Sequence, residues 1–151
     1  MTELLGRIDN LIEPLRKIAN IALSPLFDLG ARAYLGWAFF SSGLLRFKDW
    51  SNGNFSNQVF LFELEHPVPG LAPEFAAYLT MGAEIILPIM LILGLFGRFA
   101  AAGLLIMTAV IEFTYGHFAS HILWAFLAGM LFIKGPGLLS ADTLLLKFIR
   151  R

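Results

Sequence analysis

Four long apolar segments constrain this chain more than any other feature of its sequence. They span residues 29–47, 75–96, 99–118 and 121–134. An α-helix rises about 1.5 Å per residue, so about 20 residues cross the hydrocarbon layer of a bilayer. The first three segments approach that length, and the fourth is shorter, with 14 residues. The pattern predicts an all-α integral membrane protein, built as a bundle of four crossing helices.

The composition favours a membrane over water as the surroundings of this chain. Hydrophobic residues make up 58% of its 151 residues, whereas soluble domains usually contain about 45–50%. Basic and acidic residues number 11 each, which gives no reason to expect a nucleic acid partner. The absence of cysteine excludes disulfides, thiolate metal sites and dithiol redox chemistry. We expect a single domain, residues 1–151.

The distribution of basic residues predicts the orientation in the membrane. Four crossings return the chain to the side on which it started, and only Arg46 and Lys48 lie on the opposite side. The positive-inside rule places the more basic side in the cytoplasm. We therefore expect a protein of the bacterial plasma membrane with both termini cytoplasmic. The basic residues on that side are Arg7, Arg16, Lys17, Arg32, Arg98, Lys134, Lys147, Arg150 and Arg151.

The N-terminal residues 1–28 carry an apolar stripe at helical spacing, opposite charged residues. This pattern is typical of an amphipathic helix that lies on the membrane surface. Pro14 predicts a bend in that helix. A soluble helix that packs on another subunit is the alternative. The sequence contains no obvious cleavage site after the first apolar segment, so we expect no removable signal peptide.

The C-terminal residues predict a second, shorter amphipathic helix. Gly135, Pro136 and Gly137 stop the fourth apolar segment. Ser140 follows at a position suited to cap a helix, with Asp142 in its first turn. We assign these residues structural roles, and we expect Asp142 to pair with either Arg32 or Arg98.

The connections between the apolar segments differ greatly in length. The connection around residues 94–98 is very short, so it makes the second and third segments antiparallel neighbours. The outer loop, residues 48–74, is long. Its residues 55–64 are too apolar for a free loop, and we expect them to return onto the bundle as a lid.

Two glutamates lie within the apolar segments, where an ionisable side chain costs about 2.5–3.5 kcal/mol. Glu84 shares a helical face with Thr80, and Glu112 shares one with Tyr115, so both carboxylates are expected to point into the bundle. Pro88 cannot donate an N–H to the carbonyl of Glu84. We expect a kink and a polar pocket there.

Arg46 and His121 lie at the same outer level as the two glutamates. One hypothesis makes Glu84 and Glu112 catalytic groups that exchange protons with a ligand held by Arg46, His121, Thr80 and Tyr115. The alternative is that Arg46 and the carboxylates form ion pairs that only hold the helices in register.

The three histidines could also be considered as metal ligands. His66, His117 and His121 are spread over a long loop and two helix ends. Imidazole and carboxylate groups suit zinc or copper, but scattered histidines are a poor pattern for a metal site. We therefore assign no metal to them.

Several of these residues resemble the DoxX family of small four-helix membrane proteins. The matching features are Arg32, the 43–46 and 94–98 segments, Glu84 and the pattern from Gly135 to Asp142. The family is similar to the membrane subunits of thiosulfate:quinone oxidoreductase. The resemblance therefore implies quinone as a ligand, although the cofactor itself is not identified by any motif. Fold analogy alone does not determine function.

Three functions follow from these observations. The first is the membrane subunit of a redox complex, an oxidoreductase whose protein partner supplies the electrons because the chain has no cysteine or nucleotide motif. The second is a non-catalytic scaffold that recruits a partner enzyme. The third is a small transporter, which four helices accommodate only if the protein forms a homo-oligomer.

Overall fold

The computed structural model describes residues 11–150, and all regular structure in that part of the chain is helical, as predicted. The N-terminal part of the predicted surface helix, residues 1–10, and Arg151 lie outside the described residues. The helices are η1 (Ala19–Leu23), α2 (Ser24–Ser51), α3 (Phe55–Leu64), α4 (Pro73–Leu93), α5 (Gly97–Thr114), α6 (Ala119–Lys134) and α7 (Ala141–Ile149).

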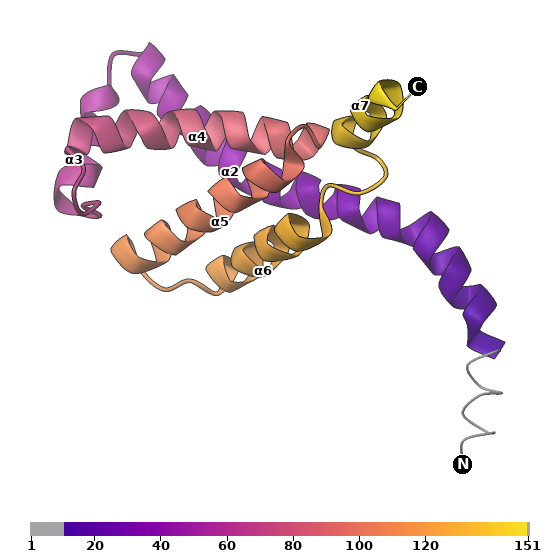
Figure 1. Ribbon diagram of the computed structural model, residues 1–151. Helices are drawn as coiled ribbons and strands as arrows, with labels where there is room; N and C mark the ends of the chain where they lie inside the picture. Colours follow the sequence, from indigo (N-terminus) through magenta and orange to yellow (C-terminus); the bar gives the residue numbers. More distant parts are fainter. Residues whose placement is uncertain (1–10, 151) are drawn as a thin grey trace.

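The described part of the N-terminal helix, residues 11–18, runs through η1 into α2 without interruption and extends away from the bundle (Figure 1). Its irregular turn is the π-helix η1, which lies nearer the bundle than the bend expected at Pro14. Pro25 accounts for this position, because it has no N–H for the carbonyl of Ile21. The N–H of Ser24 bonds instead to the carbonyl of Ala19, five residues earlier. The first apolar segment is thus part of a longer helix than predicted.

Helices α2 and α4 pack at van der Waals distance through two glycines of α2. A Cβ added at Gly36 would lie 2.6 Å from the side chain of Ile92, and one added at Gly43 would lie 2.8 Å from the backbone of Glu84. Small residues of this kind let helix backbones approach closely. The contact brings the next turn of α2, which carries Arg46, beside Glu84. α4 continues as one helix through Pro88 to Leu93.

The turn between α4 and α5 is as short as predicted. Gly94 (φ 67°) and Phe96 (φ 48°) both adopt the left-handed conformation. The N–H of Leu95 closes the end of α4 with a 2.9 Å bond to the carbonyl of Met90. α5 then ends at Thr114, four residues before the predicted end at Phe118, because Gly116 (φ 143°) takes a conformation that a helix does not allow.

Two apolar clusters hold the helices together. The larger one fills the space between α2, α4, α5 and α6. The smaller one joins α3 to α4, so residues 55–64 form a helix that covers one end of the bundle (Figure 1). We call this end the α3 end and the opposite one the α7 end. The clusters consist of Leu35, Phe39, Leu91, Ala100, Ala101, Leu104, Ala128 and Leu131, and of Phe55, Phe62, Ala76 and Ala77.

At the α7 end, the buried Arg32 joins three segments by donating to backbone carbonyls. Its guanidinium lies 3.4 Å from the carbonyl of Asp28, 3.2 Å from that of Ile92 and 2.5 Å from that of Leu139. The side chain is completely buried, with a relative exposure of 0%. The arginine predicted to be structural therefore fastens α2 to the end of α4 and to the segment before α7.

The expected ion pair of Asp142 with Arg32 or Arg98 does not form among the described residues. The carboxylate of Asp142 instead accepts the backbone N–H groups of Phe96 (2.8 Å) and Gly97 (2.9 Å). The first N–H groups of a helix have no partner within it and carry partial positive charge, so Asp142 caps α5. Ser140 caps α7, as predicted, by accepting the N–H of Thr143 at 3.2 Å.

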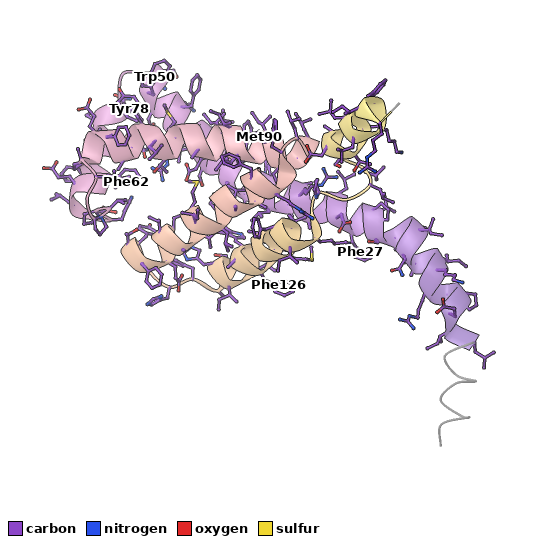
Figure 2. All side chains as sticks on the ribbon, viewed as in Figure 1. Phe27, Trp50, Phe62, Tyr78, Met90 and Phe126 are labelled. Carbon is purple, nitrogen blue, oxygen red and sulfur yellow. The ribbon has the colours of Figure 1, made fainter. Side chains whose placement is uncertain are left out.

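Large apolar side chains cover much of the outer surface. Figure 2 shows Phe27 and Phe126 pointing away from the bundle, and both are exposed. α4 and α5 are long and apolar enough to cross a membrane. α6 is apolar but has 16 residues, and the longer α2 carries charged residues along its length. Among the described helices, two are therefore candidate membrane spans.

Candidate functional site: a cavity beneath α3

A cavity of about 510 Å³ opens at the α3 end, where α5 and α6 diverge from α4 (Figure 1). Side chains from α2 to α6 and from the connection after α3 line it. Most of the lining is apolar. The polar side chains that line it are Ser42, Arg46, Gln58, Glu65, His66, Thr80, Glu84, Thr114, Tyr115 and His121. A largely apolar cavity with a few converging polar groups is the usual form of a small-molecule site.

The central polar contact of the cavity is an ion pair between Arg46 and Glu84. Nε of Arg46 lies 2.8 Å from Oε2 of Glu84, and the Glu84 side chain is only 3% exposed. A charge-assisted bond of this kind satisfies both ions in an apolar setting. Glu84 therefore pairs with Arg46, and Glu112 has other partners.

Gln58 of α3 extends this contact into a short network. Its Oε1 accepts from Nη1 of Arg46 at 2.5 Å, and its Nε2 donates to Oδ2 of Asp49 at 2.5 Å. The guanidinium carbon of Arg46 also lies 5.4 Å from the ring centre of Phe62, within cation–π range. The network ties the lid helix α3 to the charged pair in the cavity.

The predicted site residues fall into two groups. Arg46, Thr80, Glu84, Tyr115 and His121 line the same cavity. Glu112 does not. The face of α5 that lines the cavity carries Ile106, Met107, Val110, Ile111 and Thr114. Successive residues of a helix are rotated by about 100°, so Glu112 points away from this face.

Glu112 instead binds two histidines. One carboxylate oxygen lies 2.6 Å from Nδ1 of His117, and the other lies 2.6 Å from Nδ1 of His121. His66 lies apart from this group, against the rings of Phe62 and Tyr115. Within residues 11–150, no group of three or more histidine, cysteine, aspartate or glutamate side chains is arranged to hold a metal ion.

His66 lies in the connection after α3 and has an unusual environment. Burial, together with the positive charge of Arg46, lowers the pKa of His66, and the nearby Glu65 partly opposes this shift. Its Nδ1 is buried and has no hydrogen-bond partner within residues 11–150. His66 therefore favours the neutral state beside the cavity, which the sequence did not indicate.

Gln58 and Trp124 are cavity residues that sequence analysis missed. Gln58 directly precedes the apolar run Val59–Phe62 and follows another amide, Asn57, so no feature of the sequence set it apart. Trp124 lies in the fourth apolar segment, and its ring is tilted against those of Phe39 and His121, with ring centres 5.1 Å and 5.3 Å away. Its position depends on how α6 packs against α2, which periodicity does not specify.

Comparison with known proteins identifies the family of this chain. The DoxX family model matches residues 27–117, which is more than half of the chain. A relative from Haemophilus influenzae, described as an uncharacterized protein, is 29% identical over 128 residues, covering 77% of this chain and 81% of the relative. No solved structure matches. The chain belongs to the DoxX family, and its apolar helices agree with a membrane protein in contact with lipid.

Proposed function

We propose that this DoxX-family protein is the membrane subunit of a redox complex and binds a quinone-like ligand in the cavity beneath α3. The observation that carries the proposal is the buried Arg46–Glu84 pair in a cavity of about 510 Å³ with an apolar lining. An apolar ring with oxygen atoms at its edge suits such a lining, because the ring replaces water and the oxygens accept hydrogen bonds.

The residues of the cavity have distinct roles in this proposal. Arg46 donates a hydrogen bond and stabilises negative charge on a ligand oxygen. Glu84 holds Arg46 in position, and Thr80 and His121 offer further hydrogen bonds from α4 and α6. A quinone supplies redox chemistry by taking up electrons and an equal number of protons. The described residues include no cysteine, so a protein partner is the electron source.

The proposed topology has all four long helices crossing the plasma membrane. The α7 end then faces the cytoplasm with the more basic side of the chain, and the α3 end faces outwards. The charged residues of α2 support this arrangement, because Arg32 and Arg46 have partners within the bundle and need not meet lipid.

Quinone binding is tested by fluorescence of the purified protein in detergent or nanodiscs. Trp37→Phe and Trp50→Phe remove the two exposed tryptophans and leave Trp124, which lines the cavity. A short-chain ubiquinone or menaquinone is expected to quench Trp124 saturably. If titration with either quinone leaves Trp124 unquenched, the proposal is wrong.

Two variants connect the binding to the cavity. Arg46→Gln is expected to weaken quinone binding by about tenfold, because a charged hydrogen bond is lost. Lys48→Gln is the matched control, since it removes the same charge from an exposed position of the same helix. Thr80→Val changes the lining without touching the ion pair, and it is expected to weaken binding while the protein keeps its thermal stability.

A non-catalytic scaffold is the second candidate function. The observation that favours it is the network of Arg46, Glu84, Gln58 and Asp49, in which each charged group already has a partner within the protein. The double variant Arg46→Met/Glu84→Leu separates the two functions. A scaffold keeps its partner and its cellular activity with this apolar pair, whereas a quinone site loses ligand binding.

A further inference from the structure

Three side chains form a continuous path from the surface of the α3 end to the cavity. His117 is 83% exposed, Glu112 is 29% exposed, and His121 is 6% exposed. Each histidine contacts a different oxygen of the same carboxylate, at 2.6 Å in both cases. His121 also lines the cavity that contains the Arg46–Glu84 pair.

We propose that His117, Glu112 and His121 form a proton relay between water at the α3 end and the cavity. This inference rests on the proposed function for its purpose, because a ligand that takes up electrons also requires protons. It changes the role of Glu112, which was expected to act on the ligand directly. In the relay, Glu112 never touches the ligand and passes protons to His121.

The geometry permits transfer at each step. Contacts of 2.6 Å are short hydrogen bonds, and imidazole can accept a proton at one nitrogen while it donates from the other. Because Nδ1 of His121 is hydrogen-bonded to Glu112, Nε2 is the nitrogen of this ring that can face the cavity. A proton enters His117 from water, moves through the carboxyl group to Nδ1 of His121, and one proton leaves from Nε2. Proton exchange through water then returns the ring to its first tautomer, because rotation of a histidine ring does not move a proton from one nitrogen to the other.

The charges around the cavity support passage rather than storage of a proton. Arg46 already neutralises Glu84, so that carboxylate does not hold His121 permanently charged. Glu65 and His66 face the cavity from the connection after α3, and Tyr115 faces it from the end of α5. Glu112 is therefore the carboxylate that directly balances a positive charge on His121.

A structural role for the same contacts is the competing explanation. The carboxylate joins the end of α5 to the start of α6, and a clamp of this kind would also use two hydrogen bonds. A clamp and a relay differ in one respect. Only a relay can be restored by a small proton carrier in solution after the exposed histidine has been removed.

The test follows protonation of His121 through Trp124, whose ring centre lies 5.3 Å away. In the Trp37→Phe/Trp50→Phe protein, a stopped-flow drop of pH is expected to quench Trp124 when a proton reaches His121. His117→Ala should slow this change by roughly tenfold or more. Imidazole added to the buffer should restore the rate. Ser120→Ala, an exposed change at the same helix end, is the control and should leave the rate unchanged.

Three results would overturn the relay: a Trp124 signal that ignores pH, a His117→Ala rate equal to that of the parent, or a slowed rate that imidazole does not restore. The readout needs no quinone. A protein that shows the relay kinetics but binds no quinone would contradict the proposed function alone. A protein that binds quinone but lacks these kinetics would contradict the relay alone.

Discussion

The guanidinium of Arg46 and the carboxylate of Glu84 meet between α2 and α4, with 2.8 Å between Nε and Oε2. Gly43 makes this contact possible. It lies one turn before Arg46 on α2, and its missing side chain lets α2 pack on the backbone of Glu84 itself. The close packing of two helices thus determines where a buried charge pair forms, and that pair forms one side of the cavity.

Gly43→Ala is expected to destabilise the protein by about 1–3 kcal/mol, because the added methyl group would lie 2.8 Å from backbone atoms of Glu84. Thermal unfolding in detergent measures this change. Gly30→Ala is the matched control in the same helix, since an added Cβ there meets nothing within 4 Å. The control should be neutral or slightly stabilising, because alanine is the better helix former. Equal effects of the two changes would contradict the packing argument.

Glu84→Gln is expected to cost about 3 kcal/mol, because it leaves the charge of Arg46 without its ion partner. Arg46→Met/Glu84→Leu should recover most of the lost stability, since apolar pairs of similar volume often replace buried ion pairs without loss. Chemical unfolding of both variants measures the difference. A double variant less stable than Glu84→Gln would show that the pair is not an independent unit.

Asp142→Ala is expected to destabilise the protein by about 1–2 kcal/mol, because the N–H groups of Phe96 and Gly97 lose their acceptor. Asp142→Asn keeps one oxygen and should lose less. Hydrogen exchange at these two amides measures the loss locally. If both amides exchange as slowly in Asp142→Ala as in the parent, the cap contributes nothing.

Arg32→Lys is expected to cost about 2 kcal/mol, because an ammonium group cannot reach the three carbonyls that the planar guanidinium binds. Arg98→Lys makes the same change at an exposed position and should alter stability by less than about 0.5 kcal/mol. Melting temperatures of the two variants are compared. A larger loss at position 98 would be the contrary result.

The pKa of His66 should produce a specific dependence of stability on pH. Burial lowers the pKa of His66 in the folded protein, so the unfolded chain takes up a proton at higher pH than the folded one. The contribution of His66 is therefore complete above about 6.5, the usual pKa of histidine, and is lost as the pH falls towards the folded value. His66→Gln should flatten this part of a plot of melting temperature against pH. An unchanged curve would mean that His66 titrates normally.

Much of the site followed from spacing along single helices. Thr80 and Glu84 lie four residues apart on one face of α4, so the sequence could assign both to the interior, and both line the cavity. Glu112 shows the limit of this reasoning. The face that it shares with Tyr115 indicated an inward direction, but α5 turns Ile111 and Thr114 to the cavity, and Glu112 binds the two histidines instead.

The helical class, the apolar segments, the short turn at Gly94 and the cap at Ser140 could all be predicted from the sequence, because these features depend on residues close together in the chain. Tertiary structure alone decided that Glu84 pairs with Arg46, that Asp142 caps α5, and that α3 covers the cavity. These contacts join residues far apart in sequence. They depend on the rotation and approach of packed helices, which periodicity along one helix does not specify.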